Sequence, residues 1–350
     1  MYPLILTIIV LFKLKFNVNI NHTNLLQNIN NLKNKCKIEK QITLFNAFRK
    51  PVDYNSNLFV DFLSIVKDGE FYYLNVFPKI YKDICNNLNA RFFIYENNSN
   101  DTTKKILKDL ANNYLNIFVK TENYNGICET RFEKIVKARN NLSNFYKEYI
   151  SKNNIGNNIG NNIIFLYDTD IIFSYKNSIK PLIKNLNYKN LIMLTTFSIF
   201  AGKNDYLNSI LNRKNKEKFN SYINNMLNYY YDTLALNYGE TYNKNTLNFF
   251  NNIKLKSVNS CFGGLALIRK DYYLTSYFDL DKNLSKLKDE DKYMICEHWS
   301  YCKRIKMFGN IFICRDSESL WYQNKDYIEN KFNDYVYFFI NNKNFEYILK

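Results

Sequence analysis

From about residue 58, short apolar runs alternate with amphipathic stretches. Leu58 to Val66 is apolar and β-branched and ends at Lys67-Asp68-Gly69, which predicts a strand followed by a turn. Apolar residues at helical spacing then predict a helix from Phe71 to Leu88. The pattern continues with predicted strands at 91–95, 114–119 and 163–167 and predicted helices at 101–112 and 130–149. This alternation predicts an α/β fold: a mixed, mostly parallel sheet flanked by helices.

The second half of the chain repeats this alternation less regularly. The predicted elements are a strand at 191–197, a helical Tyr- and Asn-rich stretch at 203–250, strand character at 257–269, a helix at 289–308 and a strand at 311–314. Residues 151–162 are polar and contain a short repeat, which is typical of a surface loop insertion. We therefore expect a single catalytic domain over residues 58–325.

The two ends of the chain differ from this domain. Residues 1–16 begin with an apolar run, Met1 to Phe12, which is shorter than the roughly 20 residues of a membrane span. A weak signal or anchor and a packed or frayed terminus both remain open. The first implies a secretory-pathway lumen or membrane association, the second a cytoplasmic protein. Residues 17–57 form an Asn-rich lead-in or stem, and residues 326–350 a C-terminal tail.

Composition narrows the class of protein. Apolar residues make up 46% of the chain, which predicts a globular protein, and the formal net charge is +16. That charge permits binding of phosphates, but it is spread along the chain without a nucleic-acid-binding signature, so we expect no nucleic acid partner. The seven cysteines are irregularly spaced and the only histidines are His22 and His298, which argues against a zinc site.

The strongest chemical signal is Asp168-Thr169-Asp170, directly after the predicted strand 163–167. If the chain stays extended there, both carboxylates point to the same side. Paired carboxylates suit Mn²⁺ or Mg²⁺, and ligands of open α/β sheets bind at the carboxyl ends of strands. Such a metal would neutralise charge on a leaving nucleotide diphosphate. The alternative is a solvated turn.

Several other polar positions are weaker candidates. A turn after the strand 91–95 carries Glu96, Asn98 and Asp101, which could hold a base and ribose or simply lead into a helix. Arg139 could reach a diphosphate, pair with Asp168, or lie on a helix surface. The remaining candidates for sugar contact, each with a purely structural alternative, are Asp232, Gly263, Gly264, Trp299 and Trp321.

The order of these motifs resembles that of GT-A-fold glycosyltransferases, which have a Rossmann-like sheet. The resemblance spans roughly residues 58–315 and is carried by YENNSNDTT (95–103), KARN (137–140), FLYDTD (165–170), CFGGLALIRK (261–270) and ICEHWSYCKRIKMFGNIFI (295–313). It implies that Glu96 approaches the nucleoside and that Asp168 and Asp170 bind the metal and donor. It also implies that Gly263 and Gly264 lie near the donor sugar and acceptor.

Within that superfamily, the chain is most similar to the fungal capsule-associated α-1,3-mannosyltransferase family. YENNSND, YDTLA (231–235), VNSCFGG and the Glu- and Cys-containing helix follow in the same order. The resemblance implies transfer of a hexose, mannose in that family. The chain departs from the family in its acidic triplet, Asp168-Thr169-Asp170. It also has His298 where the superfamily helix carries an Asp, and no later His.

Glu297 and His298 are the catalytic candidates. In inverting members of the superfamily, a carboxylate at this helix start accepts the acceptor hydroxyl's proton, and such general-base help contributes about 10²–10⁴-fold. Glu297 is therefore the first candidate for the base, or orients the sugar if the reaction retains configuration. His298 is a third metal ligand, an alternative base, or a packed side chain.

These observations predict a metal-dependent glycosyltransferase that uses Mn²⁺ or Mg²⁺ and a nucleotide diphosphate sugar. The acceptor hydroxyl belongs to a glycan, protein or lipid, and membrane association would run through the N-terminus. One alternative is a nucleotidyltransferase, although the Gly- and basic-rich first loop of that class is absent from the sequence. The other is a non-enzymatic basic binding protein, which predicts that replacing Asp168 and Asp170 leaves binding intact.

Overall fold

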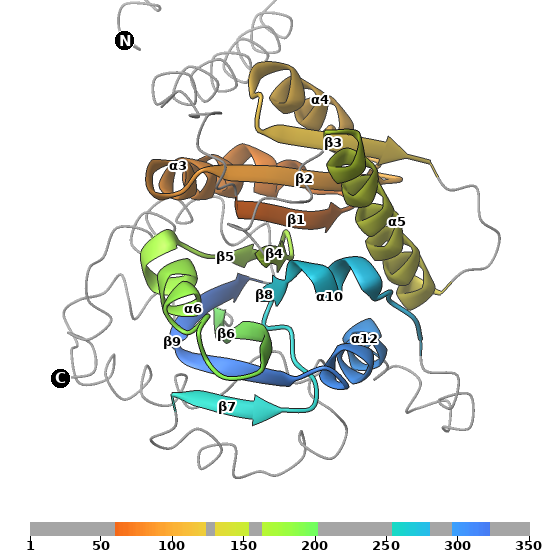
Figure 1. Cartoon of the computed structure of the whole chain (residues 1–350). Helices are drawn as coiled ribbons and strands as arrows, with labels where there is room; N and C mark the ends of the chain where they lie inside the picture. The colour runs from red at the N-terminus through yellow and green to blue at the C-terminus, as the bar shows by residue number, and fades with distance from the viewer. Residues whose placement is uncertain (1–59, 124–129, 154–162, 202–253, 281–295, 323–350) are drawn as a thin grey trace, which may run out of the picture. The chain divides into compact units, whose positions relative to one another are not determined.

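Nine strands of the described residues form one mixed sheet (Figure 1). The computed structural model describes residues 60–123, 130–153, 163–201, 254–280 and 296–322, all within the compact unit Lys50–Lys350. The strand order is β3-β2-β1-β4-β8-β6-β9-β5, and β7 pairs with β9. The strands are β1 Val60–Val66, β2 Ala90–Asn97, β3 Ile117–Glu122, β4 Ile163–Tyr167, β5 Ile171–Ile172, β6 Leu191–Ala201, β7 Leu255–Val258, β8 Leu265–Arg269 and β9 Asn310–Tyr322.

Most of these strands run in one direction. β1, β2, β3 and β4 pair in parallel, and β8 lies antiparallel between β4 and β6. β6 is parallel to β9, whereas β5 and β7 pair with β9 in the opposite sense. The strands β1, β2, β3, β4, β6 and β9 therefore share one direction, and β5, β7 and β8 oppose it. The predicted mixed, mostly parallel sheet is confirmed.

Helices connect and flank the strands because the central strands are apolar on both faces. The helical segments are η1 Tyr72–Val76, α3 Phe77–Asn87, α4 Thr103–Asn113, α5 Arg131–Lys152, η3 Tyr175–Ile179, α6 Lys180–Lys184, α10 Lys270–Thr275 and α12 Glu297–Lys306. α5 begins with a capping box, in which Thr130 and Glu133 each bond the other's backbone N–H. Aromatic residues fill the core: the Phe62 ring stacks 5.1 Å from Phe92 and 4.9 Å from Phe165.

Three sequence predictions need correction. The strand expected at 114–119 begins only at Ile117, because Tyr114 accepts a turn hydrogen bond from the Ile117 amide. Residues 257–269 form two strands, β7 and β8, with Gly263 and Gly264 in the turn before β8. The chain at Thr169 and Asp170 is a turn and not extended, so strand alternation does not orient this pair.

Other predictions fall outside the described residues. The expected helical stretch at 203–250, most of the loop insertion at 151–162 and both chain ends lie there, as does Asp232. Within the described ranges, no helix combines the length and apolarity needed to cross a bilayer.

Candidate functional site

The loops after β1 and β2 are joined by their own polar groups. The Asp68 amide donates to Ser99 Oγ at 2.9 Å, and the Asn100 amide donates to Asp68 Oδ1 at 2.7 Å. The Glu70 amide donates to Asp101 Oδ2 at 3.1 Å. Because parallel strands end at one edge of a sheet, these two loops form one rigid part of the edge where β4 also ends.

Glu96 lies beneath these loops. Its side chain is fully buried, and its Oε1 accepts the Ser99 amide hydrogen bond at 2.7 Å. Its second oxygen, Oε2, is buried with no hydrogen-bond partner among the described residues. Asn98 takes a left-handed backbone conformation, with φ of 53°, at the tight turn that follows. Two of the predicted nucleoside-binding side chains, Glu96 and Asp101, therefore hold the loops in place by accepting hydrogen bonds from backbone amides.

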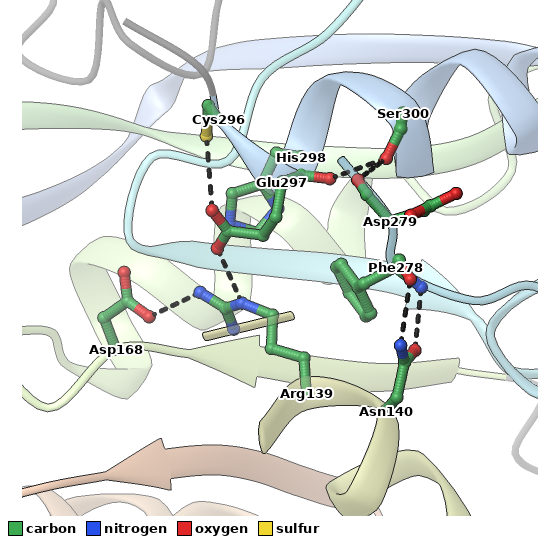
Figure 2. A network of polar contacts seen from close by, with 9 residues as sticks. All are labelled: Arg139, Asn140, Asp168, Phe278, Asp279, Cys296, Glu297, His298 and Ser300. Carbon is green, nitrogen blue, oxygen red and sulfur yellow. Dashed lines mark hydrogen bonds and ion pairs between the residues drawn. The ribbon is translucent and has the colours of Figure 1, made fainter. Parts of the chain in front are cut away.

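Arg139 of α5 connects two predicted site residues that are distant in sequence. Its Nε donates to Glu297 Oε1 at 2.8 Å and its Nη2 to Asp168 Oδ1 at 3.0 Å (Figure 2). The guanidinium also lies over the Phe262 ring, 4.9 Å from its centroid, and is 3% exposed. The structure thus brings Arg139, Asp168 and Glu297 together and excludes the alternative of a surface arginine.

Glu297 and His298 form the first turn of α12. Burial alone opposes ionisation of Glu297, but the charges of His298 and Arg139 outweigh it and lower its pKa to about 2. Burial lowers the pKa of His298 to about 3, against the attraction of Glu297. His298 is therefore neutral at neutral pH, and the charge that keeps Glu297 ionised there is that of Arg139.

The His298 ring is packed and has no hydrogen bond among the described residues. It stacks on Phe262 with ring centroids 4.0 Å apart and meets the edge of Phe278 at 5.9 Å. Its Nε2 lies 3.2 Å from Glu297 Oε1 without hydrogen-bond geometry, and both ring nitrogens are buried. Cys296 Sγ, the Glu297 carboxylate and a His298 nitrogen lie within 4.8 Å of one another, a spacing that could hold a metal ion. The Arg139 charge and the positive end of α12 disfavour a cation there.

Asp168 and Asp170 lie in the turn between β4 and β5. Burial, and repulsion from Asp170 and Glu297, raise the pKa of Asp168 to about 7, although Arg139 opposes the shift. The pKa of Asp170 is raised as well, by desolvation among the surrounding groups although the residue is exposed to solvent, and a hydrogen bond from Trp321 Nε1 to Asp170 Oδ2 at 2.8 Å opposes the shift. The two carboxylates are thus close enough to repel each other, and one arginine does not neutralise both.

Gly263 and Gly264 shape the backbone beside this turn. Both have positive φ, 65° and 68°, and the Asp168 amide donates to Gly264 O at 2.9 Å. A Cβ at Gly263 would lie 2.4 Å from Thr196 O, and one at Gly264 would lie 2.6 Å from Ile171 Cγ2. The glycines therefore allow a close approach that positions Asp168.

Trp321 is the site residue whose role the sequence did not specify. Its bond to Asp170 spans 151 positions of sequence, and an isolated tryptophan gives no signal of such a partner.

None of the five described cysteines is in a disulfide.

Comparisons with solved structures found matches among glycosyltransferases. GalNAc-T7, with UDP, GalNAc and Mn²⁺, is 13% identical over 77% of this chain and 45% of that chain, with a TM-score of 0.43. TarS 1-349 of S. aureus, in complex with UDP-GlcNAc, is 10% identical over 77% and 59%, with a TM-score of 0.41. The mannosyltransferase PcManGT from Pyrobaculum calidifontis, in complex with GDP-Man and Mn²⁺, is 10% identical over 83% and 65%, with a TM-score of 0.40.

The chain thus covers less than two thirds of the length of each of these three structures. No protein-family model matches the chain, and no curated protein matches it.

Proposed function

We propose that this protein is a metal-dependent glycosyltransferase that moves a sugar from a nucleotide diphosphate sugar to an acceptor hydroxyl. One observation carries the proposal. Arg139 joins Asp168, at the carboxyl end of β4, to Glu297, at the start of α12. Acidic side chains from distant parts of the sequence therefore meet at the sheet edge where α/β proteins bind ligands.

The residues of the β4–β5 turn fit a divalent metal. Asp168 and Asp170 supply hard carboxylate oxygens. Burial, with repulsion from Asp170 and Glu297, raises the pKa of Asp168 although Arg139 opposes the shift, so the turn holds negative charge that one arginine does not fully offset. Mn²⁺ or Mg²⁺ held by these two carboxylates would neutralise the charge that develops on a nucleotide diphosphate leaving group. His298 is the proposed third ligand, but its ring would have to leave its place on Phe262, because the Arg139 charge disfavours a cation where the ring now lies beside Glu297.

Other residues of the chain would bind and orient the substrates. Arg139 holds the Glu297 carboxylate ionised and fixed, and Nη1 of its guanidinium is buried without a hydrogen-bond partner among the described residues. That atom is a donor for a diphosphate oxygen. Glu297 would face the sugar and acceptor, and the Gly263–Gly264 turn allows backbone close to the sugar.

The nucleoside would bind over the joined loops after β1 and β2. Asn98 is the proposed contact on the loop surface, and Glu96, buried beneath the loop, would support it through the hydrogen bond that its Oε1 accepts from the Ser99 amide. Mannose is the proposed sugar, on the resemblance to the fungal mannosyltransferases. The acceptor is a glycan, protein or lipid hydroxyl, and Asp232 is proposed to contact it or the donor sugar.

A thermal-shift panel of nucleotide diphosphates with and without Mn²⁺ tests the proposal. At a hundredfold excess over Kd, a ligand adds about 2.7 kcal/mol to the stability of the native state. We expect one nucleotide diphosphate to raise the melting temperature in Mn²⁺ only, and Asp168→Asn and Asp170→Asn to abolish that rise. Asp109→Asn, an exposed carboxylate on α4, is the matched control and should keep it.

Two results would overturn the proposal. If no nucleotide diphosphate stabilises the protein in Mn²⁺, the proposed donor site is contradicted. If nucleotide diphosphates stabilise the wild type and the Asp168→Asn variant equally, the proposed role of a metal held by Asp168 is contradicted. Stabilisation by nucleoside triphosphates alone would support the nucleotidyltransferase alternative.

A further inference from the structure

Two loops at the opposite edge of the sheet expose large apolar side chains. The loop before β6 carries Tyr188, which is 49% exposed. The loop before β9 carries Met307 and Phe308, which are 80% and 60% exposed. Both loops precede strands that run parallel to β4, so they lie at the edge away from Asp168. Apolar exposure of this size, grouped in one place, is typical of an interaction surface.

The two loops are in direct contact. The Asn310 amide donates to Asn190 O at 2.7 Å, and a Cβ at Gly309 would lie 2.4 Å from the same oxygen. Each aromatic ring is also held in place. Tyr188 packs edge-on against Phe312 with ring centroids 5.0 Å apart. The loops therefore present their side chains from a fixed backbone.

α10 and the segment after it extend this surface. Phe308 stacks on Tyr272 with centroids 5.4 Å apart, and the Arg304 guanidinium lies 3.8 Å from the ring centroid of Tyr277, which is 55% exposed. We call the whole the β6–β9 edge surface, which consists of Tyr188, Tyr272, Tyr277, Met307 and Phe308. The three tyrosines contribute apolar rings that end in polar hydroxyl groups, and Met307 and Phe308 contribute fully apolar side chains.

Positive charge surrounds the apolar tips. Lys184 and Lys189 are exposed, and residues 180–190 and 301–312 contain no Asp or Glu. Among the described residues, Lys306 Nζ donates to two neutral oxygens, Val258 O at 3.2 Å and the Asn259 side-chain oxygen, so no described carboxylate cancels its charge. Among the residues that the structure describes, the neighbouring acids are Asp279, which pairs with Arg304 at 3.3 Å, and exposed Asp271 on α10.

We propose that the β6–β9 edge surface binds an anionic lipid bilayer. Met307 and Phe308 would enter the boundary between headgroups and acyl chains, the tyrosines would lie at headgroup level, and the lysines would face lipid phosphates and carboxylates. Aliphatic Met307 at the most exposed position offers no stacking plane, which favours a bilayer over single-stranded nucleic acid.

This docking would orient the enzyme. α12 spans 10 residues, Glu297–Lys306. At 1.5 Å per residue, its length places the β6–β9 edge surface about 15 Å from Glu297. The Asp168 edge then faces away from the bilayer, toward acceptors that extend from the membrane or arrive from solution.

Flotation of the full chain with vesicles tests the proposal. We expect binding to phosphatidylcholine vesicles that contain phosphatidylserine and much weaker binding to phosphatidylcholine alone. Met307→Ser/Phe308→Ser should weaken partitioning about tenfold or more, because two inserted apolar groups are lost. Lys184→Glu/Lys189→Glu should weaken it by about fivefold or more per lysine, with a matching loss of salt dependence.

Matched controls lie elsewhere on the chain. Leu115→Ser removes a 73% exposed apolar side chain before β3, and Lys105→Glu/Lys108→Glu makes the same charge change on α4. Both should bind vesicles like the wild type, and circular dichroism should show all variants folded. The proposal is overturned if the wild type does not bind anionic vesicles, or if the controls lose as much as the surface variants. It is also overturned if the surface variants abolish dimerisation or oligonucleotide binding while vesicle binding stays unchanged.

Discussion

Replacement of Arg139 by leucine should destabilise the fold strongly. The guanidinium is 3% exposed and bonds Glu297, whose side chain is 6% exposed, at 2.8 Å. Leucine keeps part of the apolar stem between Phe262 and Phe278 but leaves the Glu297 charge buried without its cation. Breaking a buried ion pair from one side costs about 3–5 kcal/mol, which is a large part of a typical total stability of about 5–15 kcal/mol.

The pH dependence identifies the cause of this loss. In the wild type the pKa of Glu297 is lowered from 4.5 to about 2, so its stabilising contribution is present above about pH 4.5 and is lost as the pH falls toward 2. Without Arg139, burial raises that pKa instead, and protonation then relieves the penalty. The difference in unfolding free energy between wild type and Arg139→Leu should therefore be largest at neutral pH and shrink on acidification.

Urea unfolding at several pH values measures this difference. Arg139→Leu/Glu297→Gln should recover about 0.5–3 kcal/mol relative to the sum of the single changes, because the two residues share one interaction. Arg91→Leu is the control, since it breaks the buried pair with Asp61, 2.6 Å apart, near the start of β1. It should lower stability without changing Mn²⁺ affinity. A loss below about 1 kcal/mol for Arg139→Leu, or a loss independent of pH, would refute the reasoning.

Three further predictions concern the β4–β5 turn. Because the pKa of Asp168 is raised to about 7, protons compete with the metal, and calorimetric Mn²⁺ affinity should fall as the pH is lowered from about 8 to 6; a flat profile would contradict this. Gly264→Ala should cost about 1–3 kcal/mol in urea unfolding, because φ is 68° and the new Cβ meets Ile171; a neutral result would contradict the strain. Trp321→Phe keeps a ring but loses the bond to Asp170, so Mn²⁺ affinity should fall about tenfold while the unfolding midpoint changes little; unchanged affinity would show that the bond does not orient the carboxylate.

The sequence predicted the sheet well because its central strands are short and mostly apolar. β1, β2 and β4 are buried nearly throughout, and such runs between amphipathic helices have few other interpretations. The contacts of Arg139 were harder to predict from the sequence, because its partner Glu297 lies 158 positions away. One signal was present: Arg139 shares the buried stripe of α5 with Leu142, Ser143 and Tyr146, where an arginine needs a buried partner.

The orientation of the two aspartates shows a different limit of the sequence. Alternation along a strand predicts which side a residue faces only while the chain remains extended, and β4 ends at Tyr167. Beyond that point, the Gly264 carbonyl positions Asp168 and the Trp321 indole positions Asp170. Both partners belong to elements later in the chain, so the turn's geometry depends on tertiary contacts that local sequence does not encode.

The low pKa of Glu297 bears on how a sugar transfer here would proceed. A general base works best when its pKa lies near the operating pH, and a carboxylate whose pKa is lowered below its ordinary value attracts a proton weakly. Arg139 contributes to that weakness through its charge and its hydrogen bond, and it is the cation that remains at neutral pH, where His298 is neutral. If Glu297 is the base, its bond to Arg139 has to weaken when substrates bind, and the diphosphate is the group that would compete for the guanidinium. If that bond persists, Glu297 is better suited to orient the sugar, as in a retaining reaction. Whether the Arg139–Glu297 ion pair persists when substrates bind would therefore distinguish the two stereochemical courses.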